Sequence, residues 1–168
     1  IGIVIGAGMA GTAMTTLLVG ARVDEIVGRR RLLMLLGMLG AFGYVAMTWS
    51  MPAALLVTCA FLGTVNAMGR DRGGLSALEQ AMLPETVPAE QRTWALAWYN
   101  AVVDTGHALG ALAAAIPSAL VAFLGFAPER SHAVVFLACG VAVAATALPY
   151  RLLDPVVEAA PSRAAHQR

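Results

Sequence analysis

Apolar residues along this chain are gathered into five long segments, and the short stretches between them are charged except at residues 50–52. The segments span residues 1–19, 32–49, 53–83, 94–124 and 132–150. No charged residue occurs from Leu32 to Gly69 or from Ala108 to Pro128. A helix of about 20 residues crosses a hydrocarbon core of about 30 Å. The pattern therefore predicts an all-α integral membrane protein with five transmembrane helices, followed by residues 151–168 outside the membrane.

The composition agrees with a bilayer environment and argues against several other settings. Hydrophobic residues make up 59% of the chain and charged residues 12%, whereas soluble domains carry about 25% charged residues. The net charge of +1 gives no electrostatic reason to expect a nucleic-acid partner. Cys59 and Cys139 lie in apolar runs without the spacing of zinc ligands or of a redox pair. We therefore expect no metal site.

The placement of arginine predicts the orientation in the membrane. Of the 11 basic residues, all arginine, one falls in residues 125–130 and the others fall in residues 20–31, 70–92 and 151–168. Basic residues in short loops stay on the cytoplasmic side. We therefore expect residues 20–31, about 84–92 and 151–168 to be cytoplasmic, in the bacterial inner membrane. Ile1 would then lie outside with no signal sequence before it, which predicts a fragment of a longer polypeptide.

The first apolar segment contains the glycine spacing of a dinucleotide-binding loop. Gly6, Gly8 and Gly11 fit G-x-G-x-x-G, but that loop needs an acidic residue about 20 positions later and further βαβ units. Here Asp24 and Glu25 lie in an arginine-rich stretch, and a long uncharged run follows. Small residues four apart in a membrane helix instead let a neighbouring backbone approach closely. We therefore expect helix packing, with no cofactor and no enzymatic activity.

The first arginine-rich stretch resembles a known transporter motif. Residues 20–31 read GARVDEIVGRRR and are similar to the loop G-x-x-x-D-(R/K)-x-G-(R/K)-(R/K) of the major facilitator superfamily, which joins helices two and three. Three residues separate Asp24 from Gly28, where the motif has two, and Glu25 stands where a basic residue is usual. The glycines, the aspartate and the arginine run match.

A second stretch supports the same resemblance. Residues 70–74 read RDRGG and fit the R-x-x-x-G core that the family carries on helix four, and residues 83–92 are similar to its loop between helices four and five. The resemblance covers essentially the whole chain and implies helices two to six of the N-terminal half. The missing helices of the same polypeptide are then partners. A C-terminal half is the alternative, because the loop can recur between helices eight and nine.

The resemblance implies a secondary active transporter that works by alternating access. In the family the first loop helps to latch the two halves and to control conformational change. That role is carried over only to the positions that match the motif, which are Gly20, Asp24, Gly28, Arg29 and Arg30. Arginines of this loop also serve topology, since they fix orientation and bind anionic lipid.

Charged residues in the third segment are candidates for the transport pathway. The resemblance implies that Arg70 lies near the substrate or proton route. Arg72 and Glu79 share a helix face with the spacing i, i+7, and ionisable groups within a membrane helix normally face a cavity or the bundle interior. The alternative is that these arginines extend to the cytoplasmic interface, helped by Glu79.

The fourth segment carries a polar stripe. Asn100, Asp104 and His107 recur at spacings of 4 and 3 and so share one helix face. A carboxylate and an imidazole shielded from headgroup water could carry protons. As alternatives, His107 could bond a neighbouring helix as a neutral histidine, and Asp104 could neutralise an arginine of the third segment.

The function expected from these observations is transport of a small solute across the lipid bilayer. Proton-coupled efflux of drugs or small metabolites is the first expectation, so the partners would be a small-molecule substrate and protons. An uptake symporter for an organic anion or a sugar is the alternative. A membrane scaffold that transports nothing would keep the helices, but it has no use for the loop motif.

Overall fold

The structure is a computed structural model, and it describes residues 2–21, 23–65 and 72–153. Every regular element in these ranges is helical, which confirms the predicted all-α fold. By length and composition, three helical stretches within them could cross a membrane: Gly2–Gly20, Ala89–Leu124 and Pro128–Leu152. Ala53–Leu62 is apolar but shorter.

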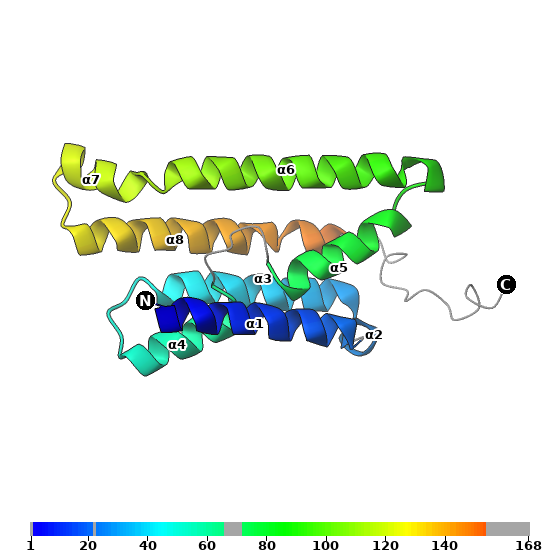
Figure 1. Cartoon of the computed structure of the whole chain (residues 1–168), viewed down its shortest axis with the longest axis horizontal. Coiled ribbons are helices and arrows are strands. Elements are labelled where there is room, and N and C mark those ends of the chain that lie inside the picture. Colours follow the sequence, from blue (N-terminus) through cyan, green and yellow to red (C-terminus); the bar gives the residue numbers. More distant parts are fainter. Residues whose placement is uncertain (1, 22, 66–71, 154–168) are drawn as a thin grey trace.

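The helices follow one another with short connections (Figure 1). In chain order they are α1 (Gly2–Gly20), α2 (Val23–Val27), α3 (Arg29–Ala46), α4 (Ala53–Leu62), α5 (Gly74–Met82), η1 (Leu83–Glu85), η2 (Ala89–Gln91), α6 (Arg92–Ala113), α7 (Ile116–Leu124), α8 (Pro128–Thr146) and η3 (Pro149–Leu152). The three η elements are single turns of 3₁₀ helix.

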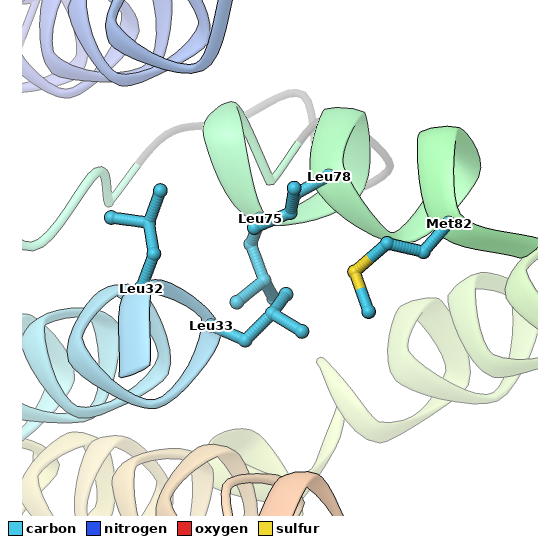
Figure 2. Close-up of a cluster of buried hydrophobic side chains, with 5 residues drawn as sticks. All are labelled: Leu32, Leu33, Leu75, Leu78 and Met82. Carbon is cyan, nitrogen blue, oxygen red and sulfur yellow. The ribbon is translucent and has the colours of Figure 1, made fainter. Parts of the chain in front are cut away.

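The helices pack as a bundle in which α6 is the least attached. α3 lies along α8, α1 packs against α4 and α5, and α7 packs against α8. α6 meets the rest of the bundle mainly through η1 and η2 at its start, and Figure 1 shows it as a separate layer beyond α8. The main buried cluster joins α3 to α5 and consists of Leu32, Leu33, Leu75, Leu78 and Met82 (Figure 2).

The prediction of one continuous helix over residues 53–83 is wrong. α4 ends at Leu62, Thr64 has a φ of 51°, and α5 begins only after Gly73, whose φ is 60°. A positive φ is incompatible with a right-handed helix. A Cβ on Gly63 would lie 2.4 Å from the Cα of Gly43, so α4 ends where it crosses α3 at backbone contact. Arg70, the residue of this segment that the resemblance placed near the substrate or proton route, lies outside the described residues.

The predicted helix over residues 94–124 is also divided. α6 starts at Arg92 and ends at Ala113, and α7 starts at Ile116. Pro117 has no N–H to donate, and its ring clashes with the carbonyl four residues earlier, which belongs to Ala113. The proline therefore sets the end of α6.

Two further boundaries differ from the prediction. Residues 20–31 are not a simple loop, because they contain α2 and the first turn of α3. Gly28 joins the two helices with a φ of 89°, a conformation that favours glycine. The last membrane helix covers Pro128–Thr146 instead of 132–150, since proline is well suited to a first helical turn, and η3 follows it.

Glycines at helix crossings bear out part of the predicted close packing. A Cβ on Gly11 would lie 1.9 Å from the carbonyl oxygen of Phe61, so α1 and α4 touch at their backbones. Gly8 and Thr12 are buried on the same side of α1. Gly2 and Gly6 have open space around them in the described structure. Of the predicted small-residue positions, Gly8, Gly11 and Thr12 therefore lie on the packed side of α1, and Gly2 and Gly6 do not.

Candidate functional site

One cluster of charges ties the first arginine-rich segment to η1. Arg29 donates from Nε to Oδ2 of Asp24 at 3.3 Å, and from Nη1 and Nη2 to the two carboxylate oxygens of Glu85. Such two-pronged pairing is the strong form of an arginine–carboxylate contact. Arg29 is buried, whereas the side chain of Glu85 is 38% exposed. The network therefore joins α2, α3 and η1 at one end of the bundle.

The electrostatics of this cluster keep Arg29 charged. The hydrogen bonds to Glu85 raise the pKa of the Arg29 guanidinium, and attraction to both carboxylates acts in the same direction, while burial opposes it. A guanidinium is protonated at any physiological pH even without this help. The cluster is thus a permanent ionic tie that does not respond to pH through Arg29.

The other predicted gating residues surround this tie. Gly20 ends α1, and Gly28 makes the turn with positive φ that places Arg29 at the start of α3. Arg30 is half-buried. A gating role for these residues stays a prediction, and among them the geometry links Asp24 directly to Arg29.

A second polar cluster forms around Glu79 of α5. Its carboxylate pairs with Nη2 of Arg72, and it accepts hydrogen bonds from the hydroxyl groups of Tyr99, at 2.8 Å, and Tyr150. Tyr99 belongs to α6 and Tyr150 to η3. The Glu79 side chain is 15% exposed. Three separate parts of the chain therefore meet at one shielded carboxylate.

This Glu79 cluster lies at the wall of a large cavity. The cavity has a volume of about 1010 Å³, and its wall comes from α5, η1, α6 and the end of α8. The lining residues are Arg72, Glu79, Leu83, Ala95, Trp98, Tyr99, Val102, Val103, Gly106, His107, Gly110, Ala111 and Thr146. Most of these side chains are apolar, so the cavity suits a solute with a large apolar surface. Among the described residues, no group of three His, Cys, Asp or Glu could hold a metal ion.

The predicted pathway residues are only partly brought together. Arg72, Glu79 and His107 line the same cavity. Asp104 and Asn100 lie on exposed positions of α6 and are not part of the wall, although Asn100 donates to the carbonyl of Leu96 at 2.9 Å. These three residues of α6 were predicted as one functional stripe. Only His107 of the three lines the cavity.

Three residues of these clusters, Glu85, Tyr99 and Tyr150, are not among the predicted site residues. Glu85 follows a proline in a loop, and Tyr99 belongs to an aromatic group at a helix start, the usual place of an interfacial anchor. Tyr150 ends an apolar segment. Their partners are 56, 20 and 71 residues away in sequence, so local pattern carries no signal for the pairing.

Most of the charged segments lie at one end of the bundle, and the start of α8, with Glu129 and Arg130, lies at the other (Figure 1). α2, η1, the start of α6 and η3 lie at the first of these ends, while the α3–α4 connection and α7 lie at the opposite end (Figure 1). The contact of Arg29 with Glu85 and that of Tyr150 with Glu79 hold this charged end together. A protein that spans a membrane has polar segments at the ends of its helix bundle, and this arrangement agrees with that requirement.

Comparison with known proteins identifies the family. The family model of the Major Facilitator Superfamily matches residues 1–168. Searches of curated proteins and of solved structures gave no match. With apolar helices of membrane-spanning length and a match over the whole chain, the protein is an integral membrane transporter that belongs to the Major Facilitator Superfamily.

Proposed function

We propose that this chain belongs to a proton-coupled exporter of small, largely apolar solutes that works by alternating access. The cavity beside α6 carries the proposal, because it joins an apolar and aromatic wall to ionisable side chains. Arg72, Glu79 and His107 would serve solute binding and proton transfer. The chain would supply helices two to six of the N-terminal half, with its arginine-rich end in the cytoplasm of a bacterial cell.

The chemistry of the wall favours efflux of drugs or small metabolites over sugar uptake. A sugar needs many hydrogen-bonding partners, and leaving its hydroxyl groups unpaired in a protein costs binding energy. Trp98, Val102 and Val103 offer an aromatic and aliphatic surface instead. Aromatic rings bind apolar and aromatic solutes through a large contact area.

Uptake of an organic anion is the second candidate, and Arg72 is the residue that favours it. Its side chain is 39% exposed and lines the cavity. Glu79 already neutralises this charge, so an anionic solute would have to compete with a carboxylate of the protein itself. That competition makes an uncharged or weakly charged solute the better match.

His107→Gln is expected to reduce proton-driven export by about tenfold or more, since proton transfer by a positioned side chain contributes at least that much. Histidine can change its charge near neutral pH, and glutamine of similar size cannot. The assay is solute movement in proteoliposomes that hold the complete transporter under an imposed pH gradient. His132→Gln is the matched control, because His132 lies exposed at the start of α8. Unchanged coupling in His107→Gln would remove His107 from the proton route.

Asp104→Asn tests whether the proton route continues along α6. Asp104 lies one turn before His107, so the two side chains could pass a proton between them. The amide of asparagine cannot relay that proton, and proton-coupled export should be abolished. The same proteoliposome assay measures this. Normal coupling in Asp104→Asn, together with lost coupling in His107→Gln, would confine the route to the residues that line the cavity.

A further inference from the structure

The attachment of α6 to the bundle depends on few contacts. Ala95 is its one buried residue within Arg92–Ala113. Nε of Arg92 donates to the carbonyl of Pro84 at 3.1 Å at the very start of the helix. Two turns later the hydroxyl of Tyr99 donates to Glu79 at 2.8 Å. Beyond Tyr99 the inner side of α6 borders the cavity.

Tyr99 therefore holds α6 within the stretch that borders the cavity. The bond reaches Glu79 on α5, which is tied in turn to η3 through Tyr150 and to the segment before α5 through Arg72. Besides the contacts at the start of α6, the carboxylate of Glu79 thus connects the loosely packed helix to the rest of the bundle, and its partner Arg72 also hydrogen-bonds Tyr99. A hydrogen bond to a charged acceptor is roughly twice as strong as one between neutral groups.

We propose that Glu79 is a proton-operated latch: with its carboxylate charged it holds α6 through Tyr99, and when it takes up a proton it releases α6 and widens the cavity. Protonation removes the attraction to Arg72 and converts one carboxylate oxygen into a donor. The two tyrosine hydroxyl groups then lose their charged acceptor. Tyr99 and Tyr150 are positioning residues in this latch. The inference rests on the proposed proton coupling and names its acceptor.

The ionisable groups around Glu79 have to be considered as other sites of proton uptake. Glu79 is the carboxylate that accepts the hydrogen bond from Tyr99 of α6. Arg72 and the two tyrosines contact it, His107 of α6 lines the same cavity, and Arg151 follows Tyr150 in η3. α2, α3 and η1 carry the cluster of Asp24, Arg29 and Glu85, in which the arginine is paired with both carboxylates. Histidine as a residue type can change its charge near neutral pH, so the test includes a variant of His107 beside the variants of Glu79.

The test measures the distance between α6 and α8 as a function of pH. Spin labels are placed at Ala108 of α6 and Leu137 of α8, both exposed, in the complete transporter with Cys59 and Cys139 replaced by alanine. In lipid nanodiscs the distance is expected to lengthen on acidification from about pH 8 to about pH 4, a range that extends down to the ordinary pKa of a glutamic acid side chain, about 4.3.

Substitutions then assign that change to the latch. Tyr99→Phe and Glu79→Gln should show the long distance at every pH. Tyr150→Phe should move the midpoint to higher pH, since a carboxylate with one donor fewer takes up a proton more readily. Tyr44→Phe removes the hydroxyl of the third tyrosine, on α3 away from the cluster, and should follow the unmodified protein. His107→Gln should also keep the pH response.

Several results would overturn the inference. A normal pH response in Tyr99→Phe, a pH response that persists in Glu79→Gln, or its loss in His107→Gln would each exclude Glu79 as the latch. Transport measured on the same samples separates this inference from the proposed function. Export that ignores the pH gradient, while the distance still depends on Glu79, would overturn proton-coupled export and leave the latch standing. If export is driven by the pH gradient but no variant alters the distance between α6 and α8, proton-coupled export stands and the latch is overturned.

Discussion

Gly11→Ala is expected to leave little folded protein in the membrane fraction. The added Cβ would lie 1.9 Å from the carbonyl oxygen of Phe61 and 2.9 Å from its carbonyl carbon. Both atoms belong to the backbone of α4, so no side chain can rotate away. Overpacking of this kind costs about 1–3 kcal/mol, and more when a helix has to move. We expect the upper end or beyond, because α1 and α4 form one of the closest helix pairs of the bundle.

Gly6→Ala is the matched control for this substitution. It adds the same methyl group to the same helix, one and a half turns earlier, where no atom lies within 4 Å. Thermal unfolding in detergent, followed by size-exclusion chromatography, should give a Tm for Gly6→Ala close to that of the unmodified protein. An equal Tm for Gly11→Ala would show that α1 and α4 do not meet at this glycine.

Arg29→Gln is expected to lower transport by about tenfold and to destabilise the charged end of the bundle. The substitution removes the donors that reach Asp24 and both oxygens of Glu85. Hydrogen bonds to charged groups contribute about 1.5–3 kcal/mol each, but Glu85 is 38% exposed, so solvent replaces part of its share. We therefore expect a net loss of about 1.4 kcal/mol, which corresponds to about tenfold in a rate.

Arg31→Gln separates this effect from a simple loss of positive charge. Arg31 lies on the same turn of α3 and is exposed, so it contributes equally to the positive charge at this end of the bundle. Initial rates of solute transport and the Tm should stay near those of the unmodified protein. If Arg31→Gln is as damaging as Arg29→Gln, the arginines act through topology or lipid binding, and the ionic tie to η1 has no role of its own.

The family and the fold class follow from local pattern because the membrane restricts the choices. In a bilayer every backbone N–H and C=O group must be paired within the chain, which leaves helices as the solution for long apolar segments. Residues 20–31 and 83–92 identify the family because their motif lies in consecutive residues. The arginine asymmetry likewise depends on positions along the chain. None of these features requires knowledge of which helices touch.

Helix continuity was less predictable, and the two breaks show why. Pro117 is visible in the sequence, and its effect on α6 follows from the chemistry of proline alone. The break after α4 has no such marker. It occurs where Gly63 meets Gly43 of another helix at backbone contact, followed by a positive φ at Thr64. Apolar and small residues on both sides of that break are equally compatible with an unbroken helix.

The sequence by itself determined that this is an all-helical membrane transporter of the Major Facilitator Superfamily, since hydrophobic run length, arginine placement and consecutive motifs are local properties. Only the tertiary structure decided that Glu79 meets Tyr99 and Tyr150, and that a cavity separates α6 from the bundle. Those contacts join residues up to 71 positions apart. They depend on where close glycine crossings place each helix, and such positions emerge only when the whole chain is packed.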